Sequence, residues 1–225
     1  MTARCLRIIL PFLTLVAVLP LTGSAGLFGN SYEKIVRKAA RYNLVPVKEA
    51  VPGILVDLQY TITSASGKPL YTKDMICLIN RHAAAKLAKA QEEVKQKGYS
   101  LLIWDAWRPK EAHLALWNAV KDPRYVVPPS KGLSWHCYGL SIDLTLAKNG
   151  RAVKMPTGYD VFTKDASSTY TGDDPAVAEH LSVLQTAMRN AGFSTIRSEW
   201  WHFDDRSNRD RIRLATAEAL GIDLP

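Results

Sequence analysis

Two short segments far apart in the chain, residues 134–143 (SWHCYGLSID) and residues 199–202 (EWWH), carry the residue types of a metal site. His136, Asp143 and His202 offer nitrogen and oxygen ligands and leave one coordination position for water, as catalytic zinc sites do. A chain with such a site must fold so that the two segments meet. This requirement constrains the fold more than any other feature of the sequence.

The spacing within each segment requires the backbone to turn. His136 and Asp143 are seven residues apart, and an odd spacing along a strand places two side chains on opposite faces of a sheet. Glu199 and His202 are three residues apart, so the chain must also bend between them. Each pair alone is weak evidence, because a buried histidine is more often structural than a ligand. A third segment, residues 104–109 (WDAWRP), strengthens the interpretation by ending an apolar strand with an arginine.

Apolar periodicity predicts the elements around these motifs. Apolar residues spaced by three and four predict helices, and short apolar runs between turn signals predict strands. The predicted helices cover residues 31–42, 79–94, 109–120, 174–191 and 208–220. The predicted strands cover residues 54–58, 100–105, 139–146, 193–197 and 201–203. The irregular order of helices and strands favours an α+β fold over a doubly wound parallel sheet.

The first 25 residues have the pattern of a signal peptide. Arg4 and Arg7 precede an apolar run at residues 8–21, and small residues follow at 23–25. The run is short for a membrane span, although an uncleaved anchor is the alternative. We therefore expect an exported protein, periplasmic or secreted, with no stable membrane span after cleavage. Residues 26–225 would form a single catalytic domain.

Charge and cysteine content narrow the expected partners. The formal net charge is +8, but the basic residues form no cluster with interleaved aromatic residues, so we expect no binding to nucleic acid. Cleavage of the signal peptide would remove Cys5 and leave Cys77 and Cys137. In an oxidising compartment these two cysteines could pair or remain separate thiols, and the sequence leaves both possibilities open.

In combination, the motifs resemble those of the D-alanyl-D-alanine dipeptidase family of zinc peptidases. The likeness runs from about Asp57 to Asp204 and rests on residues 67–69 (GKP), 104–109 (WDAWRP), 134–146 (SWHCYGLSIDLTL) and 199–203 (EWWHF). It implies an α+β fold with a central, mainly antiparallel sheet, one zinc ion per chain and hydrolysis of the D-Ala-D-Ala dipeptide. The alternative is a related D,D- or L,D-carboxypeptidase that trims peptidoglycan stems.

The resemblance also implies roles for single residues. Zinc would be bound by His136, Asp143 and His202. Glu199 would act as general base and then as general acid, and Arg108 would polarise the scissile carbonyl group. A non-catalytic module that binds the cell wall is a third hypothesis. Glu199 and Arg108 argue against it, because binding alone needs no proton transfer.

Three further residues match substrate-binding positions of the family. Ser134 matches a substrate-binding serine, Asp160 a carboxylate that binds the substrate's ammonium group, and Tyr60 an aromatic residue at the same end of the pocket. Recognition of both termini would limit the substrate to a dipeptide. The chain departs from the family pattern at residues 61–69, 137–138 and 155–157. Because these positions line the predicted pocket, the exact dipeptide and the physiological role stay open, as does the oligomeric state.

Overall fold

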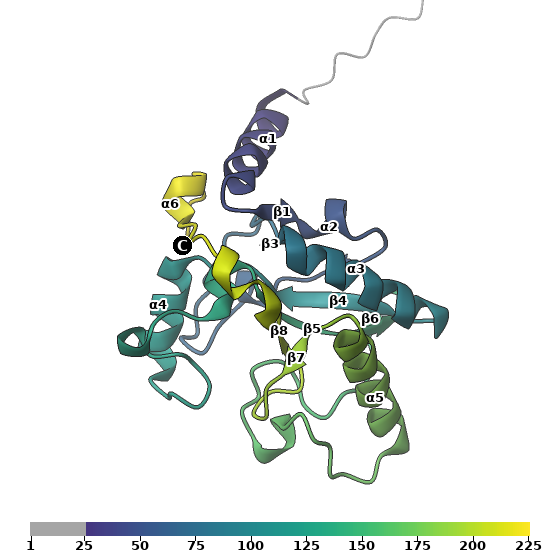
Figure 1. Cartoon of the computed structure of the whole chain (residues 1–225). Coiled ribbons are helices and arrows are strands. Elements are labelled where there is room, and N and C mark those ends of the chain that lie inside the picture. The colour runs from purple at the N-terminus through teal and green to yellow at the C-terminus, as the bar shows by residue number, and fades with distance from the viewer. Residues whose placement is uncertain (1–25) are drawn as a thin grey trace, which may run out of the picture.

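The computed structural model describes residues 26–225, and it describes side chains for residues 31–208 and 212–225 (Figure 1). The predicted signal peptide, residues 1–25, lies outside this part of the chain. The helices are α1 (Gly26–Ala40), α2 (Val47–Ala50), α3 (Arg81–Gln96), α4 (Lys110–Val120), α5 (Pro175–Asn190) and α6 (Ala217–Leu220). The strands are β1 (Leu44–Pro46), β2 (Leu55–Val56), β3 (Leu78–Asn80), β4 (Ser100–Asp105), β5 (Ser141–Lys148), β6 (Arg151–Ala152), β7 (Ser194–Thr195) and β8 (His202–Asp204). Across residues 26–225, no helix combines the length and apolar character needed to cross a bilayer.

A mixed sheet forms the centre of the molecule. Its strands follow the order β2-β4-β5-β8-β7, and the short β6 pairs with the end of β5. β2 runs parallel to β4, whereas the other pairs in this sheet are antiparallel. The predicted α+β fold with a mainly antiparallel central sheet is therefore confirmed. β1 and β3 form a separate two-stranded sheet.

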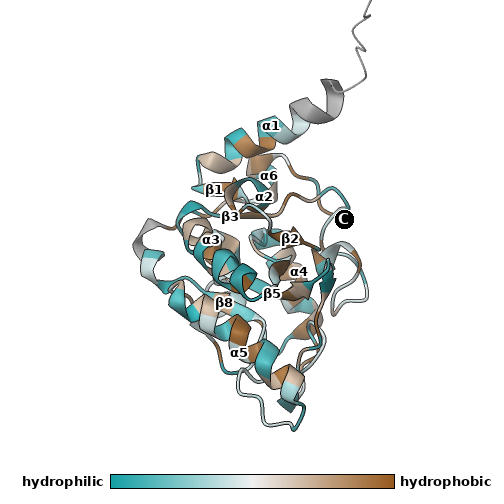
Figure 2. Ribbon diagram, turned by 90° about the vertical axis from the view of Figure 1, so that its right-hand side faces the viewer, coloured by the Kyte–Doolittle hydropathy of each residue, from teal (hydrophilic) through white to brown (hydrophobic). Residues whose placement is uncertain are grey.

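Helices α3 and α5 pack against each other and against β4 and β5 (Figure 2). Buried apolar residues such as Leu87 and Val94 of α3 and Leu184 and Met188 of α5 meet the sheet in the largest core cluster. Polar residues occupy the outer side of both helices, which is the amphipathic pattern of a helix at a protein surface. α4 belongs to a second cluster, in which it packs against residues 58–71.

The sequence places most elements correctly. The predicted strand 100–105 coincides with β4, and the predicted helices 79–94 and 174–191 correspond to α3 and α5. The prediction of a continuous helix over residues 208–220 is wrong. The segment forms a 3₁₀ helix at Arg206–Arg211, an irregular stretch and then the four residues of α6, whose N-cap is Thr216. The Asp205 side chain accepts from the backbone N–H of Ser207 and caps the first of these helices. The apolar periodicity predicts one helix here, but the two caps produce two short ones.

Candidate metal centre and active site

Three neighbouring strands place polar residues in one row across the sheet. Asp105 of β4 lies opposite Asp143 of β5, and Asp143 lies opposite His202 of β8. Directly opposite residues on antiparallel strands have their Cβ atoms about 4.5–5.5 Å apart, so the pairing alone brings these side chains together. The row is the structural reason that segments far apart in the sequence form one site.

A 3₁₀ turn, Trp135–Tyr138, carries His136 to the same place. The Ser134 side chain caps this turn by accepting from the backbone N–H of His136 at 3.3 Å. Gly139 then adopts a left-handed conformation with φ of 67°, and a Cβ atom there would lie 2.7 Å from the backbone nitrogen of Asn80. The position requires glycine for both reasons. The turn that the sequence predicts between His136 and Asp143 is therefore present.

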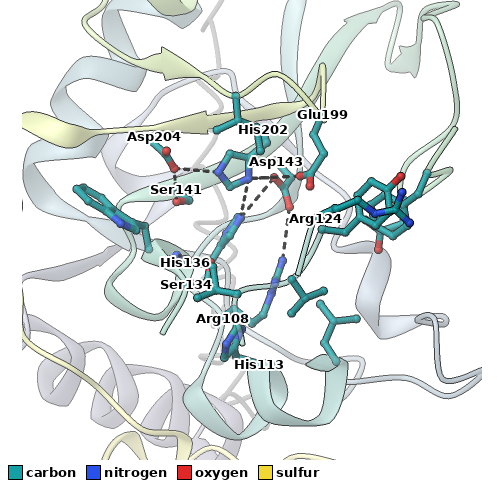
Figure 3. A pocket seen from close by; sticks show the side chains of 18 of the residues that line it. Arg108, His113, Arg124, Ser134, His136, Ser141, Asp143, Glu199, His202 and Asp204 are labelled. Atoms are coloured by element: carbon teal, nitrogen blue, oxygen red, sulfur yellow. Dashed lines mark hydrogen bonds and ion pairs between the residues drawn. The ribbon is translucent and has the colours of Figure 1, made fainter. Parts of the chain in front are cut away.

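The ligand atoms of His136, Asp143 and His202 lie close enough to share one ion (Figure 3). His136 Nε2 lies 3.2 Å from His202 Nδ1 and 3.4 Å from Asp143 Oδ1. The third distance, from His202 Nδ1 to Asp143 Oδ1, is 2.9 Å. All three side chains are buried or nearly so. The bend at Trp200-Trp201 gives His202 this position and confirms the expected turn before it.

The other nitrogen of each imidazole already has a partner. His136 Nδ1 donates to the carbonyl oxygen of Ala106 at 2.8 Å, which leaves Nε2 facing the centre. His202 Nε2 donates to Asp204 Oδ1 at 2.8 Å, which leaves Nδ1 facing the centre. The Asp204 oxygen also accepts from the Ser141 hydroxyl at 2.7 Å. Histidines that bind metals in proteins are oriented by partners of this kind.

The charges around the centre favour a cation. Asp143 Oδ2 accepts from the Tyr159 hydroxyl at 2.9 Å. Burial opposes ionisation of Asp143, but His136 and His202 outweigh it and hold the pKa of this carboxyl well below its usual range. Burial alone would lower the pKa of His202, but Asp143 and Asp204 on either side of its ring raise it well above the ordinary value. Two imidazoles and a carboxylate that converge in negative surroundings fit a divalent metal ion.

Glu199 lies beside this centre. Its Oε2 atom is 3.8 Å from His202 Nδ1, and the residue is 7% exposed. Burial raises the pKa of Glu199 to about 8, and the charges of Asp143 and Asp160 act in the same direction, while His202 opposes them. A carboxyl group with a pKa near neutrality, placed next to a metal position, can both accept and donate a proton at physiological pH.

Arg108 is fixed on the opposite side of the centre. Its Nε atom donates to Asp105 Oδ2 at 2.9 Å, and its Nη2 atom forms an ion pair with the same oxygen at 2.7 Å. The Tyr71 hydroxyl donates to the other Asp105 oxygen at 2.7 Å. Burial alone would lower the pKa of Arg108, but Asp105 raises it well above the usual value, so the guanidinium stays charged. Its Nη2 atom lies 3.6 Å from Asp143 Oδ2, within reach of any group bound at the centre.

A cavity of about 200 Å³ lies over these residues. Ser134, Asp160 and Tyr60 line it, so all three predicted substrate-binding residues reach the same cavity. The Tyr60 hydroxyl donates to Asp160 Oδ2 at 2.8 Å. Burial is the main cause that raises the pKa of Asp160 to about 7. Tyr125 and Phe162 also line the cavity, and their rings stack with centroids 4.2 Å apart.

The structure adds residues that sequence reasoning missed. Asp204 orients His202, Tyr159 holds Asp143, and Asp105 holds Arg108. The position of Asp204 was open to prediction, because residues two apart on a strand share one face of the sheet. Tyr159 gives no comparable signal, because it lies in an irregular loop.

Cys77 and Cys137 are free thiols in this structure. Burial raises the pKa of Cys137 to about 12, which makes it a poor nucleophile and a poor metal ligand at neutral pH. Of the two possibilities that the sequence leaves open, a disulfide or two separate thiols, the structure therefore agrees with two separate thiols.

Comparison with known proteins identifies the family of the chain. Residues 40–214 match the protein family described as D-ala-D-ala dipeptidase. A D-alanyl-D-alanine dipeptidase of Escherichia coli K12 is 34% identical over 163 residues, which are 72% of this chain and 83% of that protein. One of Enterococcus faecium is 31% identical over 176 residues, 69% of this chain and 87% of that protein, and one of Streptomyces coelicolor is 29% identical over 179 residues. The chain therefore belongs to the D-Ala-D-Ala dipeptidase family, and it is an enzyme of the peptidase class.

Proposed function

We propose that the protein is a zinc-dependent dipeptidase that hydrolyses D-Ala-D-Ala. The observation that carries the proposal is the convergence of His136, Asp143 and His202 beside Glu199 and Arg108 in one small cavity. Membership of the family supports the reaction, and the geometry supports the mechanism. A module that only binds the cell wall needs no proton transfer, so it would not require the buried carboxyl group of Glu199 beside the metal position.

The donor set suits zinc. Ligand atoms about 2.0–2.1 Å from a tetrahedral zinc ion lie about 3.3 Å from one another. The three distances among the ligand atoms of His136, Asp143 and His202 are 2.9, 3.2 and 3.4 Å, so the triangle needs little adjustment to bind the ion. When bound, zinc lowers the pKa of water from 15.7 to about 7 and polarises a carbonyl group.

Glu199 transfers protons in the reaction, and Arg108 stabilises the negative charge on the carbonyl oxygen. Glu199 accepts the proton of the attacking water, and a neighbouring cation favours the charged form that this step requires. The same carboxyl group returns the proton to the leaving amine. Arg108 faces the carbonyl oxygen as negative charge develops on it, and Asp105 keeps the guanidinium from rotating away.

The ends of the cavity would recognise the two termini of the substrate. Asp160, with its hydrogen bond from Tyr60, would bind the ammonium group, and the Ser134 hydroxyl would donate to the carboxylate. The cavity that Tyr125 and Phe162 help to line has a volume of only about 200 Å³, which favours a dipeptide over a peptidoglycan stem.

A paired assay tests this function. The purified protein, with zinc and with a chelator, is given free D-Ala-D-Ala and, separately, a pentapeptide that ends in D-Ala-D-Ala. We expect zinc-dependent cleavage of the dipeptide and little release of D-Ala from the pentapeptide. The reverse preference would establish the carboxypeptidase alternative. Zinc content of His136→Ala provides the control, since loss of one ligand should remove stoichiometric zinc.

We also propose that the enzyme acts outside the cytoplasm, because residues 1–25 have the pattern of a signal peptide. Mass spectrometry of the N-terminus after expression in a bacterial host tests this. Mature protein that begins near residue 26 in the periplasm or medium is the expected result. Unprocessed protein in the cytoplasm would refute export.

A further inference from the structure

A second cavity lies directly beside the first. Its volume is about 480 Å³, and its walls are formed by Gln59, Tyr60, residues 63–65, Val120, Tyr159, Asp160 and Phe162. Tyr60, Asp160 and Phe162 line both cavities, so these three side chains form a shared wall. We propose that this second cavity is a binding site for a large apolar or aromatic side chain on the amino-terminal residue of the dipeptide. The inference rests on the proposed function and names a wider substrate class for it.

The second cavity is connected to the candidate metal centre through one tyrosine. Tyr159 lines the cavity, and its hydroxyl donates to Asp143 Oδ2 at 2.9 Å. The cavity is therefore one side chain away from the position where the peptide bond would be cleaved. A remote surface hollow would have no such contact.

The covalent structure of a dipeptide determines which group enters the cavity. The ammonium nitrogen and the side chain of the first residue are bonded to the same Cα atom. If Asp160 binds the ammonium group, that side chain must lie beside Asp160. The first cavity has little room for it, because its volume is about 200 Å³ and Arg108, Glu199 and the ligand residues line its other walls. The larger cavity on the other side of Asp160 is the space available.

The lining residues suit an uncharged group. Apart from Asp160 the second cavity contains no charged residue, and Tyr159, Phe162 and Val120 give it aromatic and apolar walls. Its volume falls within the range of about 300–1,000 Å³ that is typical of small-molecule sites. The uncharged side chains of Gln59, Thr63, Ser64 and Ala65 complete the lining. Thr63, Ser64 and Ala65 belong to residues 61–69, the segment in which this chain departs from the family pattern.

The test compares dipeptides that differ only in the first side chain. The zinc-loaded protein is assayed with D-Ala-D-Ala, D-Leu-D-Ala and D-Phe-D-Ala. A site without room for growth discriminates by about 10–200-fold for each added methylene. We expect kcat/KM for D-Phe-D-Ala to lie within about tenfold of the value for D-Ala-D-Ala, since the open cavity removes that penalty.

Two substitutions that fill the cavity locate the effect. Ala65→Phe and Val120→Phe should each lower the ratio of kcat/KM for D-Phe-D-Ala to that for D-Ala-D-Ala by about tenfold or more. Ile62→Phe is the matched control: Ile62 lies in the same loop and is 65% exposed, and it does not line the cavity. This variant should leave the ratio unchanged. Thermal unfolding of each variant verifies that it folds, and the second filling variant replaces the first if one does not.

Each other outcome overturns the inference in an identifiable way. Loss of more than about 100-fold between D-Ala-D-Ala and D-Leu-D-Ala in the native protein would show that the cavity does not accept side chains. An equal effect of Ile62→Phe would show that the loop, not the cavity, controls selectivity. Cleavage of N-acetyl-D-Ala-D-Ala as fast as D-Phe-D-Ala would assign the space to an amino-terminal extension. If no dipeptide is cleaved with zinc present, the proposed function fails first and this inference with it.

Discussion

Replacement of Asp204 offers a sharp test of the metal centre, because this residue touches the centre only through a proposed ligand. Asp204 Oδ1 accepts from His202 Nε2 at 2.8 Å and from the Ser141 hydroxyl at 2.7 Å. Asp204 is only 7% exposed, so water cannot easily replace its carboxylate. Loss of Asp204 would leave His202 free to rotate and to present the wrong nitrogen to the metal.

These two hydrogen bonds set the expected magnitudes. Loss of a partner that orients a ligand typically weakens metal binding by about 10–100-fold, or about 1.4–2.7 kcal/mol. Asp204→Ala removes both the charge and the acceptor, so we expect a loss near the upper limit, about 100-fold. Asp204→Asn retains a carbonyl oxygen as acceptor but loses the stronger, charge-assisted bond, so we expect about tenfold. Ser141→Ala leaves the bond to His202 intact and should cost less than about tenfold.

Competition with a chromogenic chelator at neutral pH measures zinc affinity for the native protein and the three variants, independently of catalysis. Circular dichroism before and after metal removal verifies that each variant keeps its fold. The reasoning is refuted if Asp204→Ala binds zinc as tightly as the native protein. It is also refuted if Ser141→Ala weakens binding more than Asp204→Ala does, since Ser141 acts only through Asp204.

Three further predictions concern catalysis. Glu199→Gln should keep full zinc content but lower kcat by about 10²–10⁴, and near-native turnover in a steady-state assay would remove Glu199 from proton transfer. Arg108→Lys should lower kcat/KM by about 10²–10³, because a lysine cannot make both bonds to Asp105 and still face the carbonyl oxygen; a loss of less than about tenfold would contradict this role. The pKa of Asp160 is raised to about 7, so its carboxylate forms as pH rises through that value, and kcat/KM for D-Ala-D-Ala should rise with it. The substrate's own ammonium, with a pKa of about 8, should end this rise, and Asp160→Asn should abolish the limb near pH 7 if Asp160 binds the ammonium.

Secondary structure was predictable where side-chain periodicity and burial agree. The run at residues 100–105 is apolar throughout and becomes the buried strand β4, and the stripes at residues 79–94 and 174–191 become α3 and α5. At residues 208–220 the periodicity misleads, because side-chain caps at Asp205 and Thr216 start two separate short helices. Capping depends on single hydrogen bonds and competes successfully with a weak apolar pattern.

The sequence predicts the residues of the candidate site but not the hydrogen-bond partners that hold them. The residues to which we assign the chemistry stand in recognisable motifs: His136, Asp143, His202, Glu199 and Arg108. Their supporting partners depend on which strands pair and which loops return to the sheet. Sequence spacing shows that a residue shares a face with a ligand, but it does not show what that residue contacts.

The register between β5 and β8 is the link that turns separate motifs into one site. The pairs Asp143–His202 and Ser141–Asp204 lie two residues apart along both strands, so one register places the ligands together and the orienting hydrogen bond beside them. A slip of one residue would turn His202 and Asp204 together to the opposite face of the sheet, because side chains alternate along a strand. Leu144 and Phe203, now in the apolar core, would be displaced by the same slip. Core packing and metal binding therefore favour the same register between β5 and β8. This agreement explains how a strand of only three residues, β8, can position residues of the candidate site.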